Sequence, residues 1–391
     1  MEQEGTRVNL VESVRLVFQQ RYGREPLLVR SPGRVNIIGE HTDYNDGLVL
    51  PGAIDKSIIF GLAPRNDRKF RFLALDLKQD DEGTFDILAP SPLGWPDYLL
   101  GVIQQLEIGD RRIQGVDVVF GGNIPIGAGL SSSAAMEAGF LYGLNTMFEL
   151  GLSTFDMARM AQRAENEFVG VRCGIMDQFA NLFGKKDSVL KLDCRTLDHT
   201  VVPFPGSEVA IVLCNSNVHH SLASSEYNTR RGQCEQGVAV IAKKYPGVRN
   251  LRDVSIEQLD ECVPLMDPVV ARRCRYVIEE NKRVELACDA LQRKDLSQLG
   301  ELLVKSHEGL RDSYEVSCEE LDVLVDAALT VEGVYGARMM GGGFGGCTIN
   351  LVREDCVEEF ARQIPDLYQE ATGKETNIHL CSISDGTRVV G

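Results

Sequence analysis

The sequence has no cysteine before residue 173, and none of its 11 cysteines stands in a C-x-x-C pair. Closely spaced cysteine pairs mark most structural zinc sites, and short cysteine-dense chains mark disulfide frameworks, so neither is expected here. We expect the thiols to be reduced, as in a cytosolic protein, and most of them to act as small buried hydrophobic groups.

Long hydrophobic runs are also missing. No segment approaches the roughly 20 consecutive apolar residues that a membrane-spanning helix needs. The first residues, MEQEGTRVNLVESVRLVFQQRYG, lack the basic start and the apolar stretch of an export signal. We expect a soluble, cytoplasmic protein that is neither exported nor held in a membrane.

Positive charge is scarce as well. Lysine and arginine number 41 against 57 aspartates and glutamates, which gives a formal net charge of −16. Binding to a nucleic-acid backbone needs a concentrated basic patch, so nucleic acid is not an expected partner.

The remaining composition is that of a globular protein, with 43% hydrophobic and 25% charged residues. A chain of 391 residues exceeds one compact core of ordinary size, so we expect two domains with a cleft between them. Two prolines and a glycine in PFPGSE place the boundary near residue 205, which gives domains 1–205 and 206–391. Strands and helices mix without a regular alternation, which predicts an α+β fold.

The first forty residues predict a helix followed by two strands. Residues 8–22 place Val11, Val14 and Phe18 on one helical face. The segment EPLLVRSPGRVNIIGEH has the pattern of a strand, a turn and a second strand, with Pro32 and Gly33 in the turn.

The segment IPIGAGLSSSAAM, residues 124–136, runs from a predicted strand through a glycine loop into a predicted helix. The unpaired N–H groups and the positive dipole end of such a helix start form an anion site. Serine hydroxyls add ligands for a phosphate group or a magnesium ion. A helix that serine caps in the ordinary way is the alternative. The candidate phosphate-binding residues are Gly127, Ala128, Gly129, Leu130, Ser131, Ser132 and Ser133.

Two other nucleotide motifs are excluded. The chain has no G-x-x-x-x-G-K-[ST] segment. Gly341, Gly343 and Gly346 match G-x-G-x-x-G, but the following CTINLV favours a strand, whereas a dinucleotide fold needs a helix there. Five glycines in six positions still indicate a backbone that turns sharply or is closely approached.

The segment AENEFVGVRCGIMDQF carries two candidate carboxylates, Glu165 and Asp177. The apolar neighbours of Asp177 predict partly apolar surroundings, where burial raises the pKa of a carboxyl group and makes it a better base. A surface aspartate at a helix start is the alternative. Arg34 is the candidate cation that keeps Asp177 charged and neutralises developing phosphoryl charge.

The segment SPGRVNIIGEHTDYNDG, residues 31–47, crowds polar side chains between glycines. Glu40, His41 and Asp43 offer hydrogen-bond acceptors and one mixed donor and acceptor, which suits a ligand rich in hydroxyl groups, such as a sugar. A solvated polar loop is the alternative.

Together these segments resemble the GHMP small-molecule kinases. GRVNIIGEHTDYNDG is nearly identical to the galactokinase signature of that superfamily, IGAGLSSSAAM resembles its phosphate loop, and RMMGGGFGGCT resembles its third, C-terminal glycine motif. CGIMDQF and NSNVHHSLASSEY are also similar to galactokinase segments. The resemblance covers essentially the whole chain in the family's order. Two positions depart from it, since His219 replaces a common arginine and Met340 a common threonine.

The resemblance implies a two-domain GHMP kinase fold, with a ribosomal-S5-like N-terminal domain, a ferredoxin-like C-terminal domain and the active site in the cleft. It implies a monomeric galactokinase that transfers the γ-phosphoryl group of ATP to the anomeric C1 hydroxyl of galactose, the first committed step of galactose catabolism. Asp177 would be the catalytic base, Arg34 would keep it ionised and touch the phosphoryl group, and Ser133 and Glu165 would hold Mg²⁺. The implied sugar ligands are Arg34, Glu40, His41, Asp43, Gly174, Asp177 and Tyr227.

Two other functions stay open. A kinase for another sugar, such as N-acetylgalactosamine, is disfavoured by Thr42 in EHTDY. A non-catalytic sensor that binds sugar and ATP is disfavoured by the uninterrupted GLSSSAAM and by Asp177, because a sensor needs no base.

Overall fold

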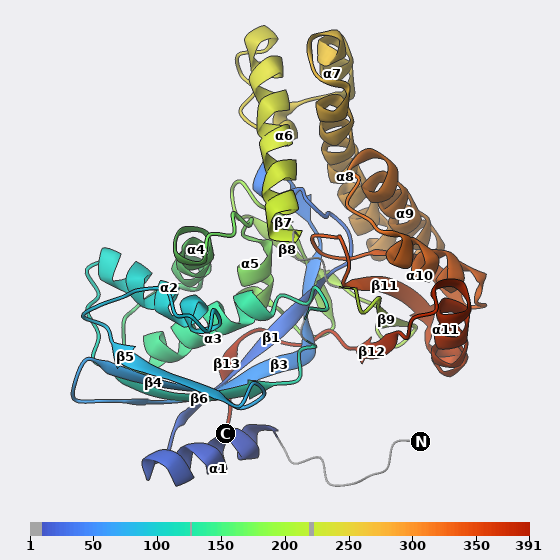
Figure 1. Cartoon of the computed structure of the whole chain (residues 1–391). Coiled ribbons are helices and arrows are strands. Elements are labelled where there is room, and N and C mark those ends of the chain that lie inside the picture. The colour runs from blue at the N-terminus through green and yellow to red at the C-terminus, as the bar shows by residue number, and fades with distance from the viewer. Residues whose placement is uncertain (1–9, 126, 219–222) are drawn as a thin grey trace.

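The structure, a computed structural model, describes residues 10–125, 127–218 and 223–391. Figure 1 shows β-sheets covered by helices, and two long helices, α6 (Ala223–Lys244) and α8 (Pro268–Gln292), that project together away from the sheets. No helix within the described ranges is long and apolar enough to cross a membrane. The mixture of sheets and helices confirms the predicted α+β class.

The first half of the chain is built on a six-stranded sheet of order β13-β1-β3-β6-β4-β5. Its strands are β1 (Leu27–Asn36), β3 (Pro51–Pro64), β4 (Lys69–Ala74), β5 (Gln79–Thr84), β6 (Val116–Gly122) and β13 (Arg388–Val389). A smaller sheet of order β2-β7-β8 contains β2 (Leu48–Val49), β7 (Ser188–Asp193) and β8 (His199–Pro203).

Helices cover both faces of the six-stranded sheet (Figure 1). One face carries α2 (Pro96–Ile108), α3 (Ser132–Met147), α4 (Thr154–Ala164) and α5 (Met176–Phe183). The other face carries α1 (Leu10–Tyr22), whose Val14 and Phe18 are fully buried. The helix predicted from the apolar spacing at the start of the chain is therefore confirmed.

The second half is built on an antiparallel sheet of order β10-β11-β9-β12. Its strands are β9 (Val209–Asn215), β10 (Val334–Met339), β11 (Cys347–Arg353) and β12 (Asn377–Cys381). Besides α6 and α8, its helices are α7 (Ile256–Cys262), α9 (Leu296–Glu308), α10 (Glu319–Thr330) and α11 (Val357–Thr372). Because β11 starts at Cys347, the G-x-G-x-x-G match joins two strands, and its exclusion as a dinucleotide motif is confirmed.

The prediction of a strand, a turn and a second strand around Pro32 and Gly33 is wrong. β1 runs through both residues, and its register against β3 shifts between Pro32 and Arg34. This is a β-bulge, which accommodates a proline and a glycine without reversing the chain. A Cβ atom added to Gly33 would lie 2.8 Å from Leu130 O. The bulge therefore brings the strand backbone against the predicted phosphate loop.

The two halves share one buried apolar cluster. It includes Phe60 and Leu141 from the first half and Leu303 and Ile349 from the second. The predicted boundary near residue 205 falls between β8 and β9, which belong to different sheets, but β13 returns to pair with β1. The division into domains 1–205 and 206–391 stays a prediction.

We expect Gly300→Ala to destabilise the protein, because α9 packs directly on β10. A Cβ atom on Gly300 would lie 1.8 Å from Tyr335 O, so backbone must move. The loss in unfolding free energy should reach about 2 kcal/mol in urea titrations. Gly232→Ala on α6 is the control, since a Cβ there meets nothing within 4 Å and alanine favours a helix by about 1 kcal/mol. Equal stability of the two variants would contradict this packing.

Candidate active site

A cavity of about 290 Å³ lies where the two halves meet. Its walls contain all seven predicted sugar ligands, Arg34, Glu40, His41, Asp43, Gly174, Asp177 and Tyr227, together with Glu165. The other lining residues are Val171, Cys173, Met176, Gly341, Gly342 and Gly343. The structure thus gathers residues from four distant segments around one space large enough for a monosaccharide.

A buried ion pair forms the floor of this site. Arg34 Nε donates to Asp177 Oδ1 at 2.8 Å and Arg34 Nη2 donates to Asp177 Oδ2 at 3.0 Å. Arg34 is 4% exposed, whereas a quarter of the Asp177 side chain, 25%, is exposed. Burial alone would lower the pKa of Arg34, but the charges of Asp177 and Glu40 outweigh it and raise that pKa. The guanidinium therefore stays charged and holds the carboxylate in a fixed plane.

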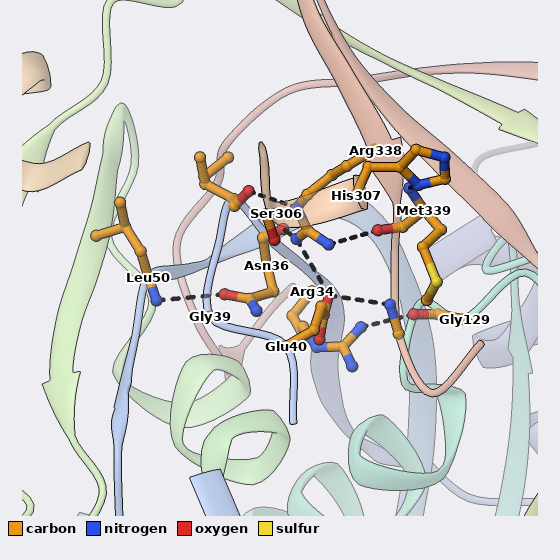
Figure 2. A network of polar contacts seen from close by, with 12 residues as sticks. Arg34, Asn36, Gly39, Glu40, Leu50, Gly129, Ser306, His307, Arg338 and Met339 are labelled. Carbon is orange, nitrogen blue, oxygen red and sulfur yellow. Dashed lines mark hydrogen bonds and ion pairs between the residues drawn. The ribbon is translucent and has the colours of Figure 1, made fainter. Parts of the chain in front are cut away.

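The same ion pair touches the phosphate loop. Arg34 Nη1 donates to Gly129 O at 2.6 Å (Figure 2), and the Ser131 hydroxyl donates to Asp177 Oδ2. Ser131 precedes α3 with a left-handed φ of 56° and makes no side-chain cap to that helix. The loop is therefore not an ordinary serine-capped helix start. Its serine instead faces the candidate base, which lies in the first turn of α5.

Two glycines of the loop adopt backbone angles that other residues avoid. Gly127 and Gly129 have φ angles of 74° and 71°, which glycine adopts without strain. The third glycine motif runs close beside it, since a Cβ atom added to Gly341 would lie 3.6 Å from Gly129 Cα. Met340, one of the two departures from the family pattern, is buried there, whereas His219 lies outside the described residues.

Glu40, His41 and Asp43 form a polar arc along the cavity wall, and this arc is tightly packed. His41 has a left-handed φ of 62°, and its Nδ1 hydrogen-bonds Tyr44 Oη at 2.7 Å. Tyr44 Oη in turn pairs with Tyr314 Oη at 2.8 Å. Burial lowers the pKa of His41 to about 3, so the ring is neutral. A hydrogen bond to the backbone of Gly342 opposes this shift, and Nε2 itself is buried. The ring therefore forms cavity wall beside the third glycine motif.

The position of the Asp43 carboxylate depends on Gly174, which lies opposite it. A Cβ atom added to Gly174 would lie 2.1 Å from Asp43 Oδ2, so any side chain at residue 174 would displace the carboxylate. Asp43 Oδ1 accepts from the backbone N–H of Tyr44 at 2.9 Å. Burial, reinforced by the charge of Asp177, raises the pKa of Asp43 to about 7.

The second half of the chain anchors this arc at points that the sequence did not reveal. Glu40 Oε1 accepts from Gly341 N at 2.9 Å and from Arg338 Nη2 at 3.1 Å (Figure 2). On α8, Glu280 accepts from the N–H of Gly39 at 2.9 Å, and Asn281 accepts from the N–H of Leu48 at 2.7 Å. No local pattern marks these contacts, because the partners are more than 200 residues apart.

Beside Asp177 lies a second group of acidic side chains. Glu165 accepts from Gln178 at 2.8 Å and also hydrogen-bonds Ser133 and Cys173. Burial and the charge of Asp177 raise the pKa of Glu165 to about 7, and burial with the charge of Glu165 raises the pKa of Glu137 well above its usual range. Glu137, a residue that the sequence reading missed, has one oxygen, Oε1, without a partner among the described residues.

Comparisons with known proteins agree with this arrangement. Residues 17–64 match the galactokinase galactose-binding signature, residues 97–185 the GHMP kinases N terminal domain, and residues 287–370 the GHMP kinases C terminal domain. A galactokinase of Roseiflexus sp. (strain RS-1) is 43% identical over 370 residues, 94% of either chain.

Solved structures show the same likeness. Lactococcus lactis galactokinase complexed with galactose has a TM-score of 0.93 and 33% identity, covering 98% of this chain and all of that one, 100%. Methanococcus jannaschii mevalonate kinase shares the fold only, with a TM-score of 0.67, 19% identity and coverage of 92% and 99%.

The fold and the three matched segments define a GHMP kinase, an ATP-dependent small-molecule kinase. Within that superfamily the chain belongs to the galactokinase family.

We expect the half-buried Asp43 carboxyl to lower stability as the pH rises. Its pKa is about 7 in the folded protein against about 3.9 in the unfolded chain, so between these values the folded state binds more protons. Asp43→Asn removes this penalty and keeps an acceptor for Tyr44. The stability gain of the variant over wild type should grow by on the order of 1–3 kcal/mol from pH 4 to pH 8, in urea unfolding without ligand. A gain that stays constant or shrinks would contradict the assignment.

Proposed function

We propose that the cavity binds α-D-galactose with its C1 hydroxyl at Asp177, while the ATP phosphates lie on the loop from Gly127 to Ser133. The reaction of the family is transfer of the γ-phosphoryl group of ATP to galactose, which yields galactose 1-phosphate and ADP, the first committed step of galactose catabolism. The observation that carries the residue roles is the position of the Arg34–Asp177 pair, which contacts both the sugar-sized cavity and the phosphate loop.

In this proposal Asp177 accepts the proton of the C1 hydroxyl as that oxygen bonds to the γ-phosphorus. The bond from phosphorus to the bridging oxygen of ADP breaks in the same step. Because phosphoryl transfer passes through a loose transition state, alignment and charge neutralisation are the main demands on the protein. Arg34 meets both, since it fixes the carboxylate plane and places positive charge beside the phosphate loop.

The sugar would be held by the remaining wall residues. Glu40 and Asp43 would accept hydrogen bonds from sugar hydroxyls, and the neutral His41 ring would form the cavity wall beside them. Gly174 and Tyr227 would complete the pocket.

The residues around Glu165 fit a magnesium ion. Among the residues that the structure describes, no group of three or more His, Cys, Asp and Glu side chains is placed to hold a metal by itself. Mg²⁺ bound with a nucleotide needs only one or two carboxylates, because phosphates and water supply the other ligands. Glu165 lies beside the Ser133 hydroxyl, and the unpartnered Glu137 oxygen shows a local excess of acceptors. We propose that Ser133 and Glu165 hold Mg²⁺, which would neutralise phosphate charge.

We also propose that the enzyme acts as a monomer in the cytoplasm, without a nucleic-acid or membrane partner. Support comes from its 11 free cysteines, which suit a reducing compartment, and from its net charge of −16.

A substrate panel tests the proposed function. With ATP and Mg²⁺, a coupled ADP-release assay should give turnover with galactose and at least about tenfold lower kcat/KM with glucose or N-acetylgalactosamine, with none on mevalonate. Preferred turnover of N-acetylgalactosamine would favour the amino-sugar kinase. Sugar and nucleotide binding without ADP release would favour the non-catalytic sensor.

Asp177→Asn tests the base. The amide keeps the shape but cannot take the proton, so kcat should fall by about 10² to 10⁴ while ATP still binds. Asp187→Asn is the control, because Asp187 is exposed and has a left-handed φ of 56°, which asparagine tolerates. Near-normal turnover of Asp177→Asn would remove residue 177 from this role.

A further inference from the structure

Arg338 is a charged side chain with no exposure at all. Its side chain is 0% exposed, and that of its partner Glu40 is 3% exposed. A buried arginine is tolerated only when its donors are satisfied, since an unpaired buried charge costs several kcal/mol. Arg338 meets this condition, because every nitrogen of its guanidinium donates to an oxygen.

The acceptors of Arg338 come from both halves of the chain. Nε donates to Ile37 O at 2.9 Å and Nη1 to Met339 O at 2.5 Å, while Nη2 donates to Asn36 O and to Glu40. Figure 2 shows the guanidinium between the Asn36–Glu40 segment and the end of β10. A lysine ammonium is a point charge and cannot reproduce this fork. Arg338 therefore fixes Glu40 relative to both β1 and β10.

Glu40 also contacts the third glycine motif, residues 341–346. Its Oε1 accepts from Gly341 N at 2.9 Å, and Gly341 begins a turn in which Gly341, Gly343, Gly345 and Gly346 all have positive φ. A glycine-rich segment loses much conformational entropy when it is ordered. Its far end is held by the second half of the chain, since Phe344 N donates to Val316 O at 2.7 Å and Gly346 O accepts from Ser216 N at 2.8 Å. The bond from Gly341 N to Glu40 ties its near end to the first half.

Gly341 lies against the phosphate loop on its other side. A Cβ atom on Gly341 would be 3.6 Å from both Cα and O of Gly129, whose carbonyl accepts from Arg34. Contacts therefore run from Glu40 through Gly341, Gly129 and Arg34 to Asp177, and Gly129 is the only one of these five residues that does not line the cavity. A sugar that orders Glu40 also orders the segment beside the nucleotide loop.

We propose that Arg338 is a positioning residue that, through Glu40 and Gly341, couples sugar binding to nucleotide binding. The first ligand to bind fixes the glycine segment, so the second meets a site that is already ordered and binds more tightly. By linkage each ligand must strengthen the other by the same factor. This inference rests on the proposed function, since it takes galactose and ATP as the two ligands.

Calorimetric titration measures the coupling. Galactose is titrated into the wild-type protein alone and with saturating Mg²⁺ and a non-hydrolysable ATP analogue, and the analogue is titrated with and without galactose. The galactose Kd should fall at least about fivefold when the analogue is bound, with the same factor in the reverse order. Arg338→Met should reduce this factor below about twofold and raise the KM of each substrate at saturating levels of the other.

Two further variants separate coupling from folding. Arg65→Met is the matched control, because Arg65 also pairs with a buried carboxylate, that of Asp117 at 2.9 Å, and neither residue lines the cavity, so it should keep the wild-type factor. Arg338→Lys keeps the charge and lacks the fork, so it should fold and still lose at least half of the factor. It carries the test if Arg338→Met does not fold.

Each outcome has one meaning. Galactose turnover by a wild-type protein whose coupling factor is below about fivefold would overturn the inference and leave the proposed function intact. Wild-type coupling in Arg338→Lys, or equal loss in Arg65→Met, would also overturn it. Failure of the wild-type protein to bind galactose would overturn the proposed function and this inference with it.

Discussion

The buried contact between Arg34 and Asp177 is the constraint on which the rest of the site depends. An arginine with 4% exposure is stable there only because a carboxylate and the Gly129 carbonyl accept its hydrogen bonds. These acceptors come from α5 and from the loop before α3, so β1, α3 and α5 must meet at one point. The β-bulge at Gly33 makes this possible, since it lets β1 approach Leu130 O. Because Arg34 needs both acceptors, its hydrogen bonds fix the position of the sugar cavity relative to the phosphate loop.

Segments with local chemistry could be predicted from the sequence. The glycine loop before α3 combines strand, turn and helix signals within a few residues, and the β-prone run after Gly346 identifies the third glycine motif as a hairpin turn. The seven predicted sugar ligands lie in two short motifs and in the segment around Tyr227. The resemblance of these segments to a known family predicts that they meet in space. Chemistry and spacing alone suggested a sugar ligand, whereas the identity of that sugar came from the resemblance.

The remaining features depend on contacts between distant parts of the chain. A proline followed by glycine favours a turn, and only pairing with β3 on one side and the phosphate loop on the other turns it into a bulge. Arg338 lies in a strand pattern that gives no sign of its acceptors near residue 37. Tyr314 hydrogen-bonds Tyr44, which lies 270 positions earlier in the chain. Glu137 lies in the middle of an otherwise apolar face of α3. Local periodicity carries no information about such partners.

The return of the chain to its first sheet has a consequence for biosynthesis. β13 forms the edge beside β1, and Thr387 hydrogen-bonds Asn181 and Ser31 in the buried interior. During synthesis the β1 edge of the first sheet therefore stays unpaired until Arg388 and Val389 have emerged from the ribosome. An exposed edge strand can pair with other chains and cause aggregation, so we expect a chaperone to protect the β1 edge during translation.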